Sequence, residues 1–237
     1  MNYAPLSHIV EPERLLLTWQ PVDEQSQHRT RRTVGEVLRG SNDSDMVFRY
    51  LIGTPDFTAA QAAGFQGFPA FPLDGAEVTK GVHETFMRRL PPRKREDFAE
   101  FLAQHRLPSP FPYSDMALLG YTGARLPSDG FALVPQFPTD AMPCDYLMEV
   151  AGLRHVYSGS TADIRNGDVV SFQAEPSNPV DSDALAVLHS GQVIGYVTRT
   201  MRGSFHAWLS SRKLLATVER QNGKPERPLI YLRISVS

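Results

Sequence analysis

The chain has 237 residues, of which 41% are hydrophobic and 21% are charged, a composition typical of folded globular proteins rather than disordered ones. No run of 18 apolar residues is present, so we expect no segment to span a membrane, and the single cysteine excludes an internal disulfide. The net charge of −2 hides a contrast, because residues 150–188 carry a net −3 and residues 189–237 a net +6. Such a basic segment either faces an anion such as a phosphate backbone or forms a solvated surface.

The first half of the chain is predicted to mix strands and helices. Runs at 13–19, 34–40 and 46–52 are typical of strands, and the last two form a pair joined by the turn SNDSD. Helices are expected at 83–90, 94–105 and 115–123, the last ending at a glycine. The prolines at 68–72 exclude a helix interior there.

The second half is predicted to be mainly β. The proline-rich residues 126–143, which include the short apolar run FALVP, are the candidate inter-domain segment. Six short strands are expected after it, at 153–159, 168–174, 184–188, 192–197, 214–219 and 229–236, with one helix at 199–211. This pattern is typical of a small barrel or a strongly curved sheet.

The residues indicate no enzyme. The sequence YSGS at 157–160 lacks the flanking glycines of a nucleophile elbow, and no phosphate-binding loop or kinase motif is present. Cys144 has no base near it in the sequence, and no two histidines have the four-residue spacing of a helical metal site. We therefore expect no metal and no cofactor. The lone cysteine and the absence of a signal-like start favour a cytoplasmic location.

A basic cluster occurs at 88–95 in the sequence RRLPPRKR. It either contacts nucleic acid or an acidic partner, or it is a solvated helix entry partly neutralised by Glu96 and Asp97.

The stretch EPSNPVDSDALAVLHSGQVIGYVTR, residues 175–199, has turn chemistry between two strands. Asn178 and Asp181 favour local side-chain to backbone hydrogen bonds, and Gly195 within a strand indicates a bulge or a close backbone approach. The 184–188 strand is apolar on both faces, which predicts a central position in its sheet. Arg199 and Arg202 begin a helix, where they would share a face and favour phosphate.

This stretch resembles the core of the HIRAN family in the order of its Asn-Pro-x-Asp loop, its Gly195-Tyr196 strand and its basic helix start, and the resemblance covers about residues 150–237. It implies a small OB-like barrel that binds single-stranded DNA and its 3′-hydroxyl end. Asp181 would accept a hydrogen bond from the terminal hydroxyl, Tyr196 would lie beside the DNA, and His155 would contact it. The implied nucleic-acid-binding residues are His155, Tyr157, Asn178, Asp181, Tyr196, Arg199 and Arg202.

Two positions depart from the family pattern. Where DNA-end-binding members carry aromatic residues that sandwich the end base, this chain has Val156 and Val180. Base–aromatic stacking contributes about 1–3 kcal/mol per base, so the loss of two platforms is expected to weaken end binding by about a hundredfold or more.

The amino-terminal part resembles the N-terminal subdomain of HipA-type toxin kinases. The shared elements, in order, are VGEVL, VFRY, FPAFPLDGAEV, the segment around RRLPPRKRED and DMALLGYTG. This piece is non-catalytic in those bacterial toxin–antitoxin systems, and no kinase motif follows it here.

Together these observations predict two domains: an α+β module at residues 1–140 and a HIRAN-like OB-like or SH3-like β-barrel with one helix at 150–237. The expected function is non-catalytic binding of DNA, either single strands or ends, linked to a protein-interaction module. The alternative is an antitoxin-like or defence-system regulator that binds a HipA-type kinase or another protein. A helicase or nuclease is a further partner that the resemblance implies, and no membrane association is expected.

Overall fold

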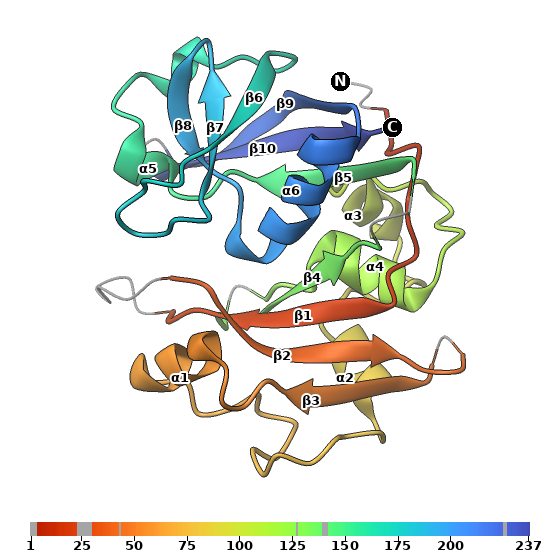
Figure 1. Cartoon of the computed structure of the whole chain (residues 1–237). Helices are drawn as coiled ribbons and strands as arrows, with labels where there is room; N and C mark the ends of the chain where they lie inside the picture. The colour runs from red at the N-terminus through yellow and green to blue at the C-terminus, as the bar shows by residue number, and fades with distance from the viewer. Residues whose placement is uncertain (1–3, 23–29, 43, 127, 139–141, 225–226) are drawn as a thin grey trace. The chain divides into compact units, whose positions relative to one another are not determined.

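The computed structural model describes residues 4–22, 30–42, 44–126, 128–138, 142–224 and 227–237, which fold into two compact units (Figure 1). The first unit consists mainly of Glu11–Phe137, and the second combines Leu6–Val10 with Pro138–Ser237. The second unit thus contains a segment from the start of the chain that sequence patterns did not indicate. The domain limits 1–140 and 150–237 stay predictions.

The first unit is built on a four-stranded antiparallel sheet of order β3-β2-β1-β4. Strands β1 (Arg14–Trp19), β2 (Arg32–Arg39) and β3 (Met46–Tyr50) confirm the three predicted strands and the pairing of the last two. Position 43 of the predicted turn lies outside the described residues.

The inter-domain segment predicted at 126–143 is correct only in part: the division between the two units does fall in it, after Phe137, but the segment also contains a strand of the first unit. Within it, β4 (Ala132–Gln136) pairs with β1, and four of its five residues are buried. The run is short, but the apolar side chains complete the sheet and its core. Residues 127 and 139–141 of the predicted segment lie outside the described part of the chain.

Among the described residues of this unit, four helices accompany the sheet: α1 (Pro55–Ala62), α2 (Val82–Met87), α3 (Phe98–Gln104) and α4 (Asp115–Thr122). Of these, α1 packs on β2, α2 on β3 and α4 on β4. The predicted helices are confirmed with shorter bounds. Helix α4 is capped at its start by Ser114, whose hydroxyl accepts a hydrogen bond from the amide of Ala117, and at its end by Gly123 with φ of 73°.

The phenylalanines of the Phe-Pro run belong to the core of this unit. Phe68 and Phe71 are buried, and their rings stack with centroids 5.4 Å apart. Tyr50 connects this run to β3, because its hydroxyl accepts a hydrogen bond from the Phe68 amide at 2.8 Å and donates one to the Phe71 carbonyl at 3.0 Å. The prolines exclude a helix, and the aromatic side chains provide the packing instead.

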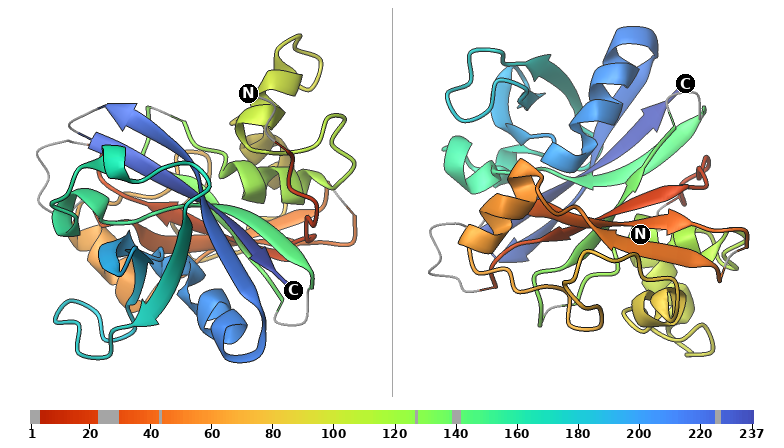
Figure 2. Two further views of the ribbon diagram at one scale, coloured as in Figure 1. Left: turned by 90° about the horizontal axis from the view of Figure 1, so that it is seen from above. Right: turned by 60° about the horizontal axis from the view of Figure 1, so that its bottom comes forward.

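The second unit is a six-stranded antiparallel sheet of order β5-β10-β9-β6-β7-β8, whose strong twist can be followed in Figure 2. Its strands are β5 (Cys144–Glu149), β6 (Val169–Ala174), β7 (Leu185–His189), β8 (Gln192–Tyr196), β9 (Leu214–Lys224) and β10 (Arg227–Val236). Strand β7 lies between β6 and β8, which confirms its predicted central position.

One strand prediction in this unit is wrong. Residues 153–159 do not form a strand; they begin with the short helix α5 (Leu153–Val156), which follows Gly152 at φ of 74°. The first strand is instead β5, which sequence patterns missed because acidic residues interrupt its apolar run. The other five predicted strands are confirmed, and the predicted helix appears as a 3₁₀ turn η2 (Arg199–Met201) followed by α6 (Arg202–Ser211).

The sheet curls until its two ends meet. Just beyond β5, Ala151 exchanges both backbone hydrogen bonds with Tyr196 of β8, at 2.9 and 2.8 Å. Gly195 permits this approach: its φ is 154°, and a Cβ there would overlap Val150 and lie 2.5 Å from the Ala151 carbonyl oxygen. The close backbone approach predicted for Gly195 is confirmed. Helix α6 supplies Phe205 and Trp208 to the core, and Phe205 contacts Phe172 of β6.

Residues 6–10 attach to the edge strand β5 of this sheet. The amides of Ser7 and His8 donate to Oδ2 of Asp145 at 2.8 and 3.1 Å, and the Asp145 amide donates to the His8 carbonyl at 2.8 Å. Asp145 is buried, and these amides satisfy its charge.

Candidate functional site

The loop between β6 and β7 is held by its own side chains. Asn178 accepts hydrogen bonds at Oδ1 from the amides of Val180 at 3.0 Å and Asp181 at 3.2 Å. Asp181 accepts one from the amide of Asp183 at 3.2 Å. This local chemistry is the turn that the sequence predicted. The side chain of Val180 is left 91% exposed at the loop surface.

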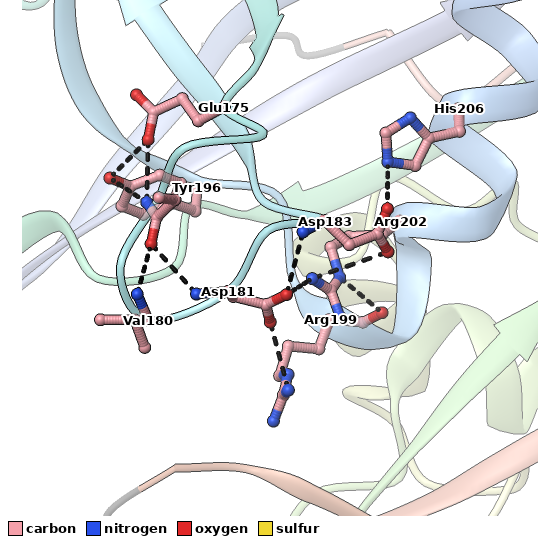
Figure 3. Close-up of polar contacts among 9 residues, drawn as sticks. Glu175, Val180, Asp181, Asp183, Tyr196, Arg199, Arg202 and His206 are labelled. Carbon is pink, nitrogen blue, oxygen red and sulfur yellow. Dashed lines mark hydrogen bonds and ion pairs between the residues drawn. The ribbon is translucent and has the colours of Figure 1, made fainter.

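The side-chain nitrogen Nδ2 of Asn178 connects the loop to β8 through hydrogen bonds. It donates to Oε2 of Glu175 at 2.9 Å and to the hydroxyl of Tyr196 at 3.3 Å, and this hydroxyl donates to the same Glu175 oxygen at 3.2 Å (Figure 3). Burial raises the pKa of the Tyr196 hydroxyl, and the charge and hydrogen bond of Glu175 raise it further. The hydroxyl therefore stays protonated at neutral pH and remains a donor.

Asp181 orients two arginines from the segment after β8. Its Oδ2 lies 3.1 Å from Nη2 of Arg199 in η2, and its Oδ1 lies 2.6 Å from Nη1 of Arg202 in α6 (Figure 3). Burial alone would raise the pKa of the Asp181 carboxyl, but the hydrogen bond from Arg202, the Asp183 amide and the two positive charges outweigh it. The pKa is therefore held below the usual range, and Asp181 is ionised at neutral pH.

A second aspartate extends this ion-pair network along α6. Asp183 lies 3.7 Å from Nη1 of Arg202, and its Oδ1 lies 2.9 Å from Nε2 of His206, one helical turn further on (Figure 3). Because two aspartates balance two arginines, the network supplies orientation rather than net charge. Long-range attraction of an anion would come from the +6 balance of residues 189–237.

Helix α5 lies beside β8 (Figure 1). A Cβ at Gly152, which precedes the helix, would lie 3.7 Å from the Tyr196 ring. On the helix, Nε2 of His155 accepts a hydrogen bond from Arg154 at 3.1 Å, and Val156 is 39% exposed. Just after it, the Tyr157 hydroxyl donates to the Ser160 carbonyl at 3.3 Å.

The structure thus brings five of the seven predicted residues into one network and places the other two on the neighbouring helix segment. The five are Asn178, Asp181, Tyr196, Arg199 and Arg202, and the two are His155 and Tyr157. A nucleic-acid-binding role for all seven stays a prediction.

Three members of the network were not selected from the sequence: Glu175, Asp183 and His206. The spacing of Arg202 and His206, four residues apart in a predicted helix, places both on one face, and Asp183 follows Asp181 by two residues. Such spacings are common in sequences, so they do not indicate a site by themselves. Only the tertiary structure shows that these residues form ion pairs with one another.

The basic cluster at 88–95 is used largely within the first unit. Arg89, whose side chain is 7% exposed, forms two hydrogen bonds to Asp129 at 2.8 and 2.9 Å and one to the Ala124 carbonyl at 2.7 Å. Arg93 pairs with Asp115, and Arg95 pairs with Asp97. These three arginines therefore serve internal ion pairs, which favours the structural interpretation of the cluster.

Within the described residues, no group of three or more His, Cys, Asp or Glu side chains is arranged to hold a metal ion. The helices found in that part of the chain are too short or too polar to cross a bilayer. A cytoplasmic location stays a prediction.

Comparison with known families identifies the second unit. Residues 145–237 match the family model described as the HIRAN domain, so this part of the chain is a HIRAN domain, as its loop and helix-start motifs predicted. The curled antiparallel sheet is consistent with that assignment. The predicted likeness of the first unit to HipA-type kinases stays a prediction.

Two solved structures are similar to the chain. One is the HIRAN domain of human HLTF, with 20% identity over 39% of this chain and 74% of that chain and a TM-score of 0.32. The other is a protein from Lactobacillus plantarum, with 23% identity over 39% of this chain and 94% of that chain and a TM-score of 0.31. No curated protein sequence matches the chain.

Proposed function

We propose that the HIRAN domain of this protein binds nucleic acid, as single-stranded DNA or DNA ends, and acts by binding rather than by catalysis. One observation carries the proposal: residues from the 178–183 loop, from β8 and from the start of α6 converge in one hydrogen-bonded network. The loop presents exposed Val180, and Arg199, which pairs with Asp181 of the same loop, has a side chain that is 43% exposed. An ordered arginine of this kind suits a phosphate contact.

The acceptor capacity of Asp181 supports an end-reading role. An ionised carboxylate has about four acceptor positions, and the Asp183 amide, Arg202 and Arg199 account for three of them. The remaining position, on Oδ2, suits a hydroxyl donor such as a 3′-hydroxyl end. A 3′-phosphate would place a second anion beside the carboxylate, so it should bind more weakly.

The test is fluorescence anisotropy of the full chain with labelled single-stranded and duplex oligonucleotides at low and moderate salt. We expect binding that weakens as salt rises, because phosphate contacts release counterions. Absence of binding at both salt concentrations would overturn the proposal.

The substitution Arg199→Gln tests whether Arg199 makes the proposed phosphate contact. It should weaken binding severalfold and reduce the salt slope by about 0.7, the value for one phosphate contact on a single strand. The matched control is Lys80→Gln, which removes one exposed positive charge from the first unit and should leave both affinity and slope unchanged. A 3′-hydroxyl and a 3′-phosphate oligonucleotide are compared in the same assay, and equal affinities would exclude end reading by Asp181.

For the first unit, binding of a HipA-type kinase or another protein partner stays a prediction. Co-purification of the full chain with the product of a neighbouring gene would test it. A helicase or nuclease recovered in the same way would instead favour a role in DNA processing.

A further inference from the structure

The segment Leu6–Val10, which we call the strap, belongs to the second unit, although the first unit separates it in sequence from the rest of that unit. The strap contacts β5, an edge strand in the sheet order β5-β10-β9-β6-β7-β8. An edge strand presents backbone groups that can pair with another extended segment. The strap occupies that place at Asp145, whose amide donates to the His8 carbonyl at 2.8 Å.

Two kinds of contact hold the strap. The amides of Ser7 and His8 both donate to Oδ2 of Asp145, at 2.8 and 3.1 Å, and hydrogen bonds to a charged acceptor are stronger than neutral ones. Leu6 and Ile9, which flank these two residues, are buried. The domain therefore recognises an extended segment that carries two consecutive backbone amides between two apolar side chains.

The residue that follows the strap is fixed in the first unit. The Glu11 carboxylate accepts hydrogen bonds from the Ser114 amide at 2.9 Å and from Arg39 at 2.6 Å. Arg39 also donates to the Pro12 carbonyl at 3.0 and 3.1 Å. The chain is thus anchored on both sides of a very short connection.

This connection, the hinge, consists of Ile9 and Val10. Both side chains are β-branched, which favours an extended backbone. Glu11 is restricted to extended conformations because Pro12 follows it. Short hinges with little conformational freedom favour exchange of a terminal segment between two copies of a chain.

A second copy of this chain fits the acceptor, because its strap has the same sequence. Exchange conserves the hydrogen bonds to Asp145 and the burial of Leu6 and Ile9, so monomer and dimer differ in the hinge and in the entropy of association. The chain passes from one unit to the other after Val10 and again after Phe137. A strap docked on its own domain requires both passages to join the same two units, and exchange removes that requirement.

We propose that the edge of β5 at Asp145 is a docking surface for the strap of a second copy, and that the protein forms a dimer by reciprocal exchange of Leu6–Val10. Two copies related by a two-fold axis fill both acceptors at once, so the assembly closes as a dimer. The interaction uses neither the 178–183 loop nor a nucleic acid. It is therefore independent of the function proposed above.

Size-exclusion chromatography with light scattering tests the association on the full chain, after nuclease treatment to remove nucleic acid. We expect a species of twice the monomer mass whose share increases with protein concentration. A flexible Gly/Ser insertion between Val10 and Glu11 keeps the strap contacts and frees the hinge, so it should shift the equilibrium to monomer. A wild type that stays monomeric at all concentrations would overturn the proposal, and so would a dimer that the insertion leaves unchanged.

Two variants determine whether the strap itself is exchanged. Ser7→Pro removes one amide donor from the strap, and Asp145→Ala removes the acceptor. In a mixture, the intact strap of the Asp145→Ala chain finds an intact acceptor only on the Ser7→Pro chain, which restores one hydrogen bond to a carboxylate. The mixed dimer should therefore form at about tenfold lower concentration than the dimer of either variant alone.

Ser7→Ala is the matched control because it keeps the amide. Its mixture with Asp145→Ala restores no hydrogen bond, so it should show no such gain. Circular dichroism checks that each variant is folded, and if Asp145→Ala is not, the insertion variant still decides the question. If the mixture of Ser7→Pro and Asp145→Ala associates no more tightly than the separate variants, the strap is not exchanged and the proposal fails.

Discussion

Two arginine–aspartate pairs, one in each unit, look alike in sequence and differ in their surroundings. Arg89 is 7% exposed, pairs with Asp129, and lies with its guanidinium carbon 5.6 Å from the centroid of the Phe68 ring. Arg199 is 43% exposed, and its partner Asp181, in the loop between β6 and β7, is 20% exposed. The Arg89 guanidinium is enclosed by carbonyls and aromatic rings although its partner Asp129 is 28% exposed, whereas the Arg199 guanidinium remains open to a ligand.

The difference shows why a basic residue in a sequence does not by itself indicate a binding site. In the Arg89 pair the guanidinium is desolvated, so its interactions stabilise the fold, and removing it leaves the buried Ala124 carbonyl without this hydrogen bond and Asp129 without its partner. In the Asp181 network the aspartate restricts the conformations of two arginines, and water still reaches Arg199, whose side chain is 43% exposed. The first arrangement is suited to stability and the second to recognition.

The largest expected effect tests whether the Arg89–Asp129 pair stabilises the fold of the first unit. Arg89→Met removes the hydrogen bonds to Asp129 and Ala124 and should destabilise the first unit by about 2 kcal/mol, measured by chemical denaturation. Under conditions where the variant is folded, its affinity for oligonucleotides should equal that of the wild type. A stable variant with reduced affinity would reverse the roles assigned to the two pairs.

A smaller effect is expected from Asp181→Asn, because its ion pairs are partly solvated. The substitution should lower stability at pH 7 by about 1 kcal/mol. Since the folded-state pKa of Asp181 is depressed, this contribution is present above the unfolded pKa of about 3.9 and is lost as pH falls below it through the folded pKa.

The melting temperatures of wild type and Asp181→Asn should therefore differ at pH 7 and converge as pH falls below about 4. Asp163→Asn, an exposed carboxylate in the same unit, serves as the control and should show no such pattern. A difference that is constant from pH 7 to pH 3 would show that the carboxylate charge is not the cause.

The smallest expected effect concerns the surface loop that contains Asp181 and its contacts with β8. Glu175→Gln removes a charge that raises the pKa of Tyr196 while it keeps an acceptor for the Tyr196 hydroxyl and Asn178. The pKa of Tyr196 should fall, and affinity should change by no more than about threefold, equivalent to under 1 kcal/mol.

Tyrosinate absorbance during a pH titration measures this change, and Tyr196→Phe assigns the signal among the eight tyrosines. If Tyr196 titrates identically in wild type and Glu175→Gln, the charge of Glu175 is not a cause of the raised pKa of Tyr196.

Much of the local structure could be predicted because it depends on neighbouring residues. The Asn178 turn, the helix ending at Gly123 and the central strand β7 follow from side-chain preferences and apolar patterns. The errors occurred where local signals compete. Strand β5 was not predicted because acidic residues interrupt its apolar run. The β-favouring residues after Gly152 form a helix instead of a strand because the glycine turns the chain at the end of the sheet.

The candidate site was predictable only in part for a related reason. The family-like order of Asn178, Asp181, Tyr196 and Arg199 pointed to one site, and these residues do meet in the structure. Asp183 and His206 are not part of that order. They join the network because the pairing of β7 with β8 brings the loop before β7 next to the helix after β8.

By itself, the sequence determined which segments form turns and most of the strands and helices, and it identified the HIRAN domain, because these depend on short-range chemistry and on the order of a few residues. Only the tertiary structure decided which charges are enclosed and which face solvent, since that depends on contacts between distant segments. Arg89 and Arg199 are equally basic as residues, and the packing around them makes one a part of the core and the other a candidate ligand contact.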